Sequence, residues 1–297
     1  MLCWAALACA AAGVAEPRRD IPDLIGEAAQ HVTSEDETLI DLARRFRVGF
    51  VELMAANPGV DPWLPGEGTR LELPTRHLVP SAPREGLVVN LAEQRLYYFP
   101  PTPAAVLTFP ISSGGPGCET PLGLTHITRK RPDPSWVPPE SIRRQRPELP
   151  AVVPPGPDNP LGRFALDLGW PGYVIHGTNQ PFGIGRRVSH GCIRMYPEDI
   201  ARLFPRVAVG TPVRVVEQAV KLGWHAGELY LEVHPGQWQI DELEMTGRLA
   251  NRAPPPLSGW IRATAGADAP RLDWALINAI AAARRGLPTR ITRPGPG

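Results

Sequence analysis

The 297-residue sequence carries almost no net charge, because 31 basic residues balance 30 acidic ones and leave a formal charge of +1. This balance provides no general attraction for nucleic acid or for an anionic membrane surface, so we expect no nucleic-acid partner. Long apolar runs are also missing: beyond the first fifteen residues there is no stretch of about 18 apolar residues that could span a bilayer. We therefore expect no transmembrane segment.

Cysteine is scarce as well. The four cysteines stand at positions 3, 9, 118 and 192. They lack the dense spacing of a disulfide-rich scaffold and the paired C-x-x-C spacing of a structural zinc site. At most one or two of them are expected to take part in chemistry.

Proline and glycine, in contrast, are abundant, with 37 and 29 residues. Such a composition disfavours long helices and favours β structure joined by ordered loops. Ten of the prolines lie between residues 131 and 160, where they argue against a helix or a central strand. Long irregular segments inside a domain are usually lids or linkers. Apolar side chains such as Trp136 and Val153 favour a packed lid here, and a passive surface loop is the alternative.

The first fifteen residues, MLCWAALACAAAGVA, form an apolar stretch with small residues at Gly13 and Ala15. This pattern suits a signal peptide cleaved after Ala15, although the usual positively charged start is missing. It predicts an exported protein, and the alternative is a frayed apolar terminus.

Residues 25–79 are predicted to form a small α+β unit. Ser34 and Glu37 have the spacing of a capping box, and apolar residues at helical spacing follow from Leu39 to Phe46. This pattern predicts one amphipathic helix.

A second short helix is expected from Phe50 up to Asn57-Pro58, and a closing strand around residues 71–74. With DETLIDLARRF at 36–46 and LELP at 71–74, the unit resembles a LysM module. The resemblance implies binding to the N-acetylglucosamine backbone of peptidoglycan. The alternative is a helical cap without a sugar site.

From residue 84 to about 217 the pattern changes to short strands. Residues 87–91 and 95–99 are rich in β-forming side chains and are separated by the polar Ala92-Glu93-Gln94, which predicts a hairpin. Residues 106–111 predict a further strand.

The segment from Tyr173 to Met195 carries the chemistry. A thiol becomes an effective nucleophile when an imidazole accepts its proton. Cys192 has two candidate bases, His176 at the end of a predicted strand and His190 only two residues away. His190 is poorly placed to reach the sulfur, so we predict His176 as the base. The backbone around His190 and Gly191 is the candidate oxyanion hole.

Three other interpretations of Cys192 remain open from the residues alone. It could be an inert core thiol, although its neighbours are polar. It could form a disulfide with Cys118, which an exported location permits. It could also bind a metal together with His176 and His190, although no fourth ligand is close in sequence.

His176-Gly177-Thr178 followed by Ser189-His190-Gly191-Cys192-Ile193-Arg194 resembles the signature of the YkuD-type L,D-transpeptidases. Residues 90–98, 120–123, 155–162 and 200–203 also look like the Gram-negative, LysM-bearing branch of that family. The resemblance covers about residues 25–235. It implies a mainly β catalytic domain with short helices over residues 84–217, including one near 197–204.

The family resemblance also assigns roles. Cys192 is the nucleophile, His176 the general base, and the backbone carbonyl of Gly177 orients the imidazole. His190 and Gly191 supply the oxyanion hole. The residues expected to contact substrate are Arg194, whose planar fork suits a carboxylate, and Ser189, Thr178 and Tyr173. No metal and no organic cofactor are implied.

The implied substrate is the stem tetrapeptide of peptidoglycan, whose acyl group would pass through a Cys192 thioester. The acceptor would be a diaminopimelate amine or the terminal Lys of an outer-membrane lipoprotein, and carbapenems would label the thiol. The implied location is the periplasm. An L,D-carboxypeptidase or another cysteine-dependent peptidoglycan peptidase is the alternative. An NlpC/P60-type peptidase is disfavoured because its Cys precedes its His, and the intact motif argues against a non-catalytic wall-binding protein.

Two features fall outside the resemblance. Cys118 stands where the family usually has small or charged residues, which leaves an oxidative cross-link, a regulatory thiol or a bystander as interpretations. The C-terminal part from about residue 236 also lies outside the resemblance, and it belongs to residues 218–297, which are expected to form a helical extension of unknown role. Its clearest element is a helix over 274–283 ended by Arg284, Arg285 and Gly286, and packing against the catalytic domain is the simplest expectation.

Overall fold

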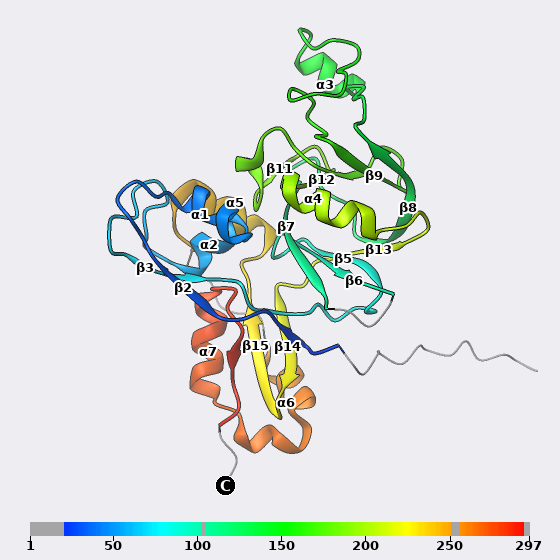
Figure 1. Cartoon of the computed structure of the whole chain (residues 1–297). Coiled ribbons are helices and arrows are strands. Elements are labelled where there is room, and N and C mark those ends of the chain that lie inside the picture. The colour runs from blue at the N-terminus through cyan, green and yellow to red at the C-terminus, as the bar shows by residue number, and fades with distance from the viewer. Residues whose placement is uncertain (1–20, 102–104, 251–255, 294–297) are drawn as a thin grey trace, which may run out of the picture.

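The computed structural model describes residues 21–101, 105–250 and 256–293. The predicted signal peptide, residues 1–15, lies outside these ranges. None of the helices within them is long and apolar enough to cross a bilayer. The chain forms a central β structure, an N-terminal unit at its side and a C-terminal unit below it (Figure 1).

The central structure is an eight-stranded barrel, because β6 pairs with both β5 and β7 and thereby closes the sheet. Its interior is filled by aliphatic side chains, among them Leu87, Val89 and Leu96. The predicted hairpin is confirmed. In the order in which they pair, the barrel strands are β7 (Leu107–Gly114), β12 (Ile193–Met195), β10 (Val174–His176), β9 (Phe164–Leu168), β8 (Gly123–Pro132), β13 (Pro212–Val216), β5 (Gly86–Asn90) and β6 (Arg95–Phe99).

Two further elements border the barrel next to the motif. β11 (Arg187–Ser189) pairs with β7 outside the closed ring. Helix α4 (Pro197–Leu203) follows β12, as predicted, with Pro197 at its first turn and Ile200 and Leu203 buried in the core.

The N-terminal unit has the predicted order of strand, helix, helix and strand, and its two strands pair antiparallel. The predicted cap is wrong, however. The first helix begins at Leu39, and the hydroxyl of Thr38 accepts the hydrogen bond from the backbone N–H of Asp41. Ser34 lies one turn too early. The elements are β2 (Ala29–Val32), α1 (Leu39–Phe46), α2 (Phe50–Ala56) and β3 (Arg70–Leu73).

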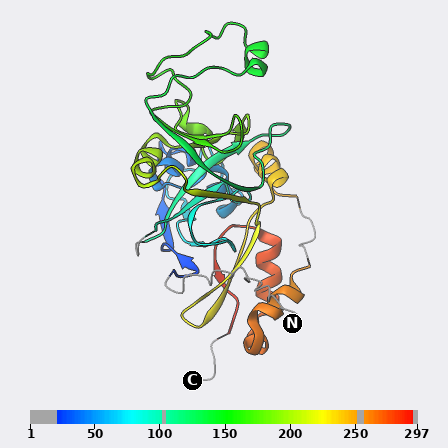
Figure 2. The same ribbon diagram turned by 90° about the vertical axis from the view of Figure 1, so that its right-hand side faces the viewer.

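The proline-rich segment forms an arm between β8 and β9 that projects away from the barrel (Figures 1 and 2). The predicted packed lid is therefore wrong for most of its length, and Val137 and Val152 are exposed. A short helix, α3 (Glu140–Gln145), also forms at its tip, because the prolines border those six residues and do not interrupt them.

The base of the arm is ordered by Asn159, whose side chain is fully buried. Its Nδ2 donates to the carbonyl oxygens of Pro134 at 2.7 Å, Pro154 at 3.1 Å and Val153 at 3.3 Å. Prolines supply no backbone N–H, so a proline-rich segment has few donors of its own for these carbonyls. The side-chain amide of Asn159 thus links the two chain segments at the base of the arm.

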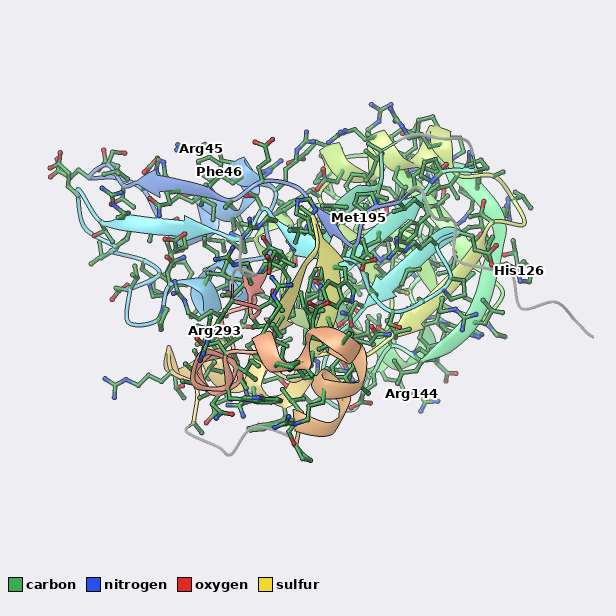
Figure 3. The ribbon with its side chains drawn as sticks, turned by 90° about the horizontal axis from the view of Figure 1, so that it is seen from below. Arg45, Phe46, His126, Arg144, Met195 and Arg293 are labelled. Atoms are coloured by element: carbon green, nitrogen blue, oxygen red, sulfur yellow. The ribbon has the colours of Figure 1, made fainter. Side chains whose placement is uncertain are left out.

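The C-terminal unit is not merely helical, which corrects the sequence expectation. It contains a three-stranded sheet covered by two helices, with its own apolar core. The predicted helix over 274–283 is confirmed. In Figure 3, seen from below, these helices lie in front of the sheet. The elements are β14 (Val220–His225), β15 (Glu228–Val233), β16 (Thr289–Arg290), α6 (Ser258–Ala265) and α7 (Trp274–Ala283).

Another C-terminal helix, α5 (Gln237–Thr246), packs elsewhere. Its Ile240 and Leu243 complete the apolar core of the N-terminal unit, next to α2. The expectation that this region packs simply on the catalytic domain is therefore incomplete. The C-terminal unit joins the other two parts of the molecule.

A buried lysine lies where the three parts meet. The Nζ of Lys221, on β14, lies 2.7 Å from Glu93 Oε2 in the β5–β6 turn and 2.9 Å from Glu232 Oε1 on β15. It also donates to the carbonyl of Leu78 at 2.7 Å and to the Tyr97 hydroxyl at 3.2 Å. Because all three charged side chains are almost completely buried, each needs its partner.

We predict that Lys221→Met lowers the free energy of unfolding by about 3–5 kcal/mol, since it leaves Glu93 and Glu232 buried without their cation. Lys130, the only other lysine of the chain, is the matched control. It contacts the Phe204 ring at 4.6 Å, so Lys130→Met should cost about 1 kcal/mol or less. Urea unfolding measures both. Equal losses of unfolding free energy in the two variants would contradict the role of Lys221 as the buried partner of the two glutamates.

Candidate active site

The parallel pairing of β10 with β12 brings the motif together. Ile175 lies opposite Ile193 and His176 opposite Arg194. Both isoleucines are buried in the barrel core. Since side chains alternate along a strand, His176 and Arg194 point to the outer face. Cys192 directly precedes β12, two residues before Arg194, and the same alternation, continued by one residue, puts it on the same face.

His176 is almost completely buried, and its Nδ1 lies 2.6 Å from the backbone carbonyl oxygen of Gly177. A carbonyl only accepts, so Nδ1 carries the proton and the Nε2 lone pair is left free to accept another. Burial, together with the charges of Arg194 and Arg131, lowers the pKa of His176 to about 3. The imidazole is therefore neutral near pH 7.

Cys192 is a free, half-buried thiol whose Sγ lies 3.5 Å from the carbonyl oxygen of Gly172. Burial raises its pKa above the ordinary thiol value, and a backbone hydrogen bond from Val174 and the charge of Arg194 oppose this only in part. Cys118 is also free and exposed, so the disulfide interpretation is wrong for this structure. The site holds a neutral thiol and a neutral imidazole, and proton transfer must accompany attack.

Ser189 organises the loop that carries the thiol. Its hydroxyl donates to the backbone carbonyl of Cys192 at 2.5 Å and accepts from the backbone N–H of Gly191 at 3.1 Å. The predicted roles are therefore corrected: the Gly191 N–H is already used within the loop, and Ser189 orders the backbone instead of facing substrate. Of the predicted oxyanion donors, the backbone around His190 and Cys192 remains.

Thr120 holds the same loop from the other side, and sequence reasoning did not assign it a role. Its hydroxyl donates to the Gly191 carbonyl at 2.8 Å and accepts from the Gly114 backbone N–H at 3.0 Å. Its position 71 residues before Gly191 gives no spacing signal. Gly191 itself has a φ of +100°, and a Cβ there would lie 2.8 Å from the Tyr173 ring. Glycine is required at this point.

The remaining predicted contact residues differ in their surroundings. Thr178 is buried, and its hydroxyl accepts from the Gln180 backbone N–H at 2.9 Å, so it stabilises a turn. Tyr173 is half-buried beside Gly191 and Trp170. His190 is exposed. Tyr173 and His190 are thus accessible to solvent, Thr178 is not, and substrate contact by these residues stays a prediction.

Arg194 has no ion-pair partner among the described residues. Asp167, on neighbouring β9, pairs instead with Arg131, with 2.7 Å between Oδ1 and Nη2. Burial lowers the pKa of Arg194, which shows that its charge is poorly solvated. An incoming carboxylate would supply the missing partner.

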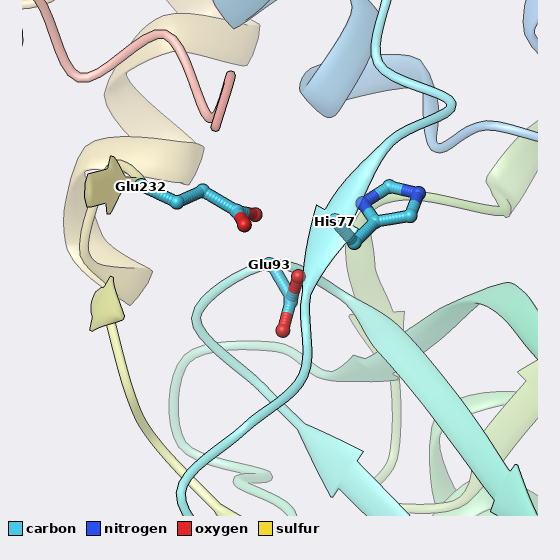
Figure 4. A group of neighbouring side chains, drawn as sticks. All are labelled: His77, Glu93 and Glu232. Carbon is cyan, nitrogen blue, oxygen red and sulfur yellow. The ribbon is translucent and has the colours of Figure 1, made fainter. Parts of the chain in front are cut away.

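Metal binding at the motif finds no support, because Cys192, His176 and His190 do not converge to ligand distance in the described part of the chain. One group elsewhere does converge: His77, Glu93 and Glu232 place potential ligand atoms within 4.8 Å of one another (Figure 4). Lys221 Nζ, however, contacts both glutamates. The Lys221 ammonium already supplies the positive charge between the two glutamates, so these three residues do not fit a metal ion.

Comparison with known proteins now identifies the family. The model of the L,D-transpeptidase catalytic domain, YkuD, matches residues 84–215. The Salmonella typhimurium protein "Probable L,D-transpeptidase ErfK/SrfK" is 39% identical over 92% of this chain and 89% of its own length. The chain belongs to the YkuD family of L,D-transpeptidases. The predicted family is thereby confirmed.

Other family members agree. The Escherichia coli protein "Probable L,D-transpeptidase YcfS" is 44% identical over 74% of this chain and 72% of its own length. Among solved structures, the Enterococcus faecium L,D-transpeptidase catalytic domain acylated by ertapenem is 28% identical. It covers 45% of this chain and 97% of that one, with a TM-score of 0.35.

The pKa directions in this transpeptidase predict its pH dependence. Because the Cys192 pKa is raised, less thiolate exists at neutral pH than in free cysteine, and the rate of alkylation by iodoacetamide should rise at higher pH than it does for free cysteine. Because the His176 pKa is lowered to about 3, no inflection should occur near pH 6.5. Labelling of Cys192→Ala gives the background from the other cysteines. An inflection near pH 6.5 would indicate a preformed imidazolium–thiolate pair.

Removing the Ser189 hydroxyl should slow acylation of the transpeptidase by ertapenem about 10- to 100-fold, because two backbone groups of the nucleophile loop lose their partner. Ser189→Thr keeps the hydroxyl and should lose less than Ser189→Ala. Ser113, whose buried hydroxyl has no hydrogen-bond partner in the described structure, is the control. If Ser189→Ala and Ser113→Ala acylate equally fast, the ordering role of Ser189 is wrong.

Proposed function

We propose that this transpeptidase acts on peptidoglycan stem tetrapeptides through a thioester on Cys192. The observation that supports the proposal is the strand pairing that sets His176 opposite Arg194 on one face, with Cys192 directly before β12. The hydrogen bond from His176 Nδ1 to Gly177 leaves Nε2 as the proton acceptor. Nucleophile, base and carboxylate-binding group thus have the arrangement that acyl transfer needs.

In the first half-reaction, Cys192 Sγ attacks the carbonyl carbon of the third residue, diaminopimelate, of the donor stem. Its proton passes to His176 Nε2, and backbone N–H groups near His190 and Cys192 stabilise the oxyanion. The peptide C–N bond then breaks, and the terminal D-Ala leaves as an amine after receiving the proton from His176. Arg194 binds a substrate carboxylate.

In the second half-reaction, an amine or water attacks the thioester carbon and His176 accepts its proton. The C–S bond then breaks, and His176 passes the proton to the sulfur and restores the thiol. Three acceptors fit this chemistry: a diaminopimelate amine, the terminal Lys of an outer-membrane lipoprotein, and water. Water would make the enzyme an L,D-carboxypeptidase, which is the second candidate. The carboxypeptidase candidate is supported by the solvent exposure of His190, two residues before the thiol, because water can approach there.

The N-terminal unit is proposed to bind the glycan strand, as its LysM-like sequence suggests. Its loop between α2 and β3 exposes Trp63 and Leu64, and the Trp63 ring lies 6.0 Å from that of Phe50. An exposed indole supported from beneath is a suitable platform for a sugar ring. This substrate, together with the apolar start of the chain, supports a periplasmic location.

Product analysis separates the acceptors. Purified tetrapeptide muropeptides are incubated with enzyme, with and without a peptide ending in Lys, and the products are identified by mass spectrometry. We expect cross-linked dimers or a Lys-linked conjugate with release of D-Ala, and no product from Cys192→Ala. Only trimmed tripeptide in every mixture would favour the carboxypeptidase. Full turnover by Cys192→Ala would exclude the nucleophile assignment.

A further inference from the structure

The loop that joins His176 to Cys192 is supported from outside the barrel. Its last part, β11, pairs only with β7, and the register shifts between Arg187 and Ser189. An edge strand with an irregular ladder has few backbone hydrogen bonds to fix its position. The position of the nucleophile loop therefore depends on additional contacts.

Helix α5 of the C-terminal unit supplies these contacts. Arg187 Nη1 lies 2.5 Å from Asp241 Oδ2 and donates to the Gln237 carbonyl at 3.2 Å. Arg186 Nε lies 3.4 Å from Glu244 Oε1. The Arg187 side chain is only 6% exposed, so this ion pair is little screened by solvent.

Asp241 and Glu244 stand three residues apart and therefore share one side of α5. Ile240 and Leu243, on the adjoining side, are buried in the core of the N-terminal unit. The helix is thus fixed by apolar packing on one side while its carboxylates hold the loop on the other. A rigid element can position the residues that it binds.

The N-terminal unit reinforces the same loop. The Phe50 backbone N–H donates to the Ile184 carbonyl at 3.4 Å, and the Arg186 guanidinium lies 4.4 Å from the centre of the Phe50 ring. A Cβ on Gly185 would lie 2.1 Å from the Phe50 nitrogen. The backbones of α2 and the loop are therefore in direct contact.

The contacts continue to the thiol. Arg187 and Ser189 are two residues apart on β11, and both are buried on the same side of the strand. Ser189 in turn bonds the backbone of Gly191 and Cys192. A connected path leads from Asp241 through Arg187 and Ser189 to the nucleophile.

We propose that α5, which lies outside the matched catalytic domain, is a positioning element of the active site, and that Asp241 is a positioning residue for Cys192. The Arg187–Asp241 pair sets the place of β11, and so the place of the loop that presents the thiol. The C-terminal unit then serves the reaction as well as the fold. This inference rests on the proposed role of Cys192.

The test compares Asp241→Asn with Asp268→Asn. Asp268 lies in the same unit and also pairs with an arginine, with 3.0 Å between its Oδ1 and Arg271 Nη1, but it does not contact the loop. The readout is acylation of the full chain by ertapenem, followed by stopped-flow and intact mass. We expect Asp241→Asn to lower the limiting acylation rate about tenfold and to change the apparent dissociation constant less than about twofold. Asp268→Asn should leave both unchanged.

A double variant adds a second criterion. If the two side chains act as a pair, Arg187→Gln combined with Asp241→Asn should be no slower than Asp241→Asn alone, and Asp241→Glu should recover part of the rate. Equal acylation by wild type and Asp241→Asn would overturn the proposal. So would equal losses in Asp241→Asn and Asp268→Asn, which would indicate general destabilisation. Absence of a Cys192 adduct in the wild type would instead overturn the proposed function.

Discussion

The parallel pairing of β10 with β12 is the constraint on which the site depends. It places His176 opposite Arg194, eighteen positions later in the chain, while Ile175 and Ile193 fill the core behind them. A shift of one residue in either strand would turn His176 or Arg194 into the apolar interior. The core therefore fixes the register, and the register fixes which side chains can react together.

Parallel neighbours need a long connection, and that connection is the least regular part of the site. Hydrogen bonds from Ser189 and Thr120 order its end, and contacts with α2 and α5 hold its middle. Burial favours the neutral form of both reactive groups, because it lowers the pKa of the His176 imidazole and raises the pKa of the Cys192 thiol. A protonated thiol is a poor target for oxidants, so the raised pKa of Cys192 also limits its oxidation.

Much of this was predictable from local sequence. The periodicity of apolar residues indicated α1 and α2, and an apolar run with its stop signals indicated α7. The β-rich runs indicated the first hairpin, and the motifs around His176 and Cys192 indicated the family. Interactions between distant residues were not predictable. Thr120 and Asp241 reach the nucleophile loop only through the fold, and the Thr38 cap competes with an equally plausible Ser34 pattern nearby.

The predictions that were wrong for the proline-rich segment and for Ser189 have physical explanations as well. Prolines at the borders of α3 permit a short helix that their number seemed to exclude. At the base of the arm, the buried amide of Asn159 donates to the carbonyls of Pro134 and Pro154, so this base is ordered by bonds within the arm. The role of Ser189 was misassigned because a motif residue beside a nucleophile suggests substrate contact, whereas its hydroxyl is used by the backbone.

Locating the covalent intermediate tests the central claim most directly. Trypsin cleaves after Arg187 and Arg194, so it releases Cys192 in the short peptide 188–194, well separated from Cys118. The enzyme is quenched in acid during turnover of a tetrapeptide donor, digested, and analysed by tandem mass spectrometry. The account predicts a tripeptide acyl group on the sulfur of Cys192, attached with loss of D-Ala. An acyl group on Cys118, or on another residue while Cys192 stays unmodified, would contradict it.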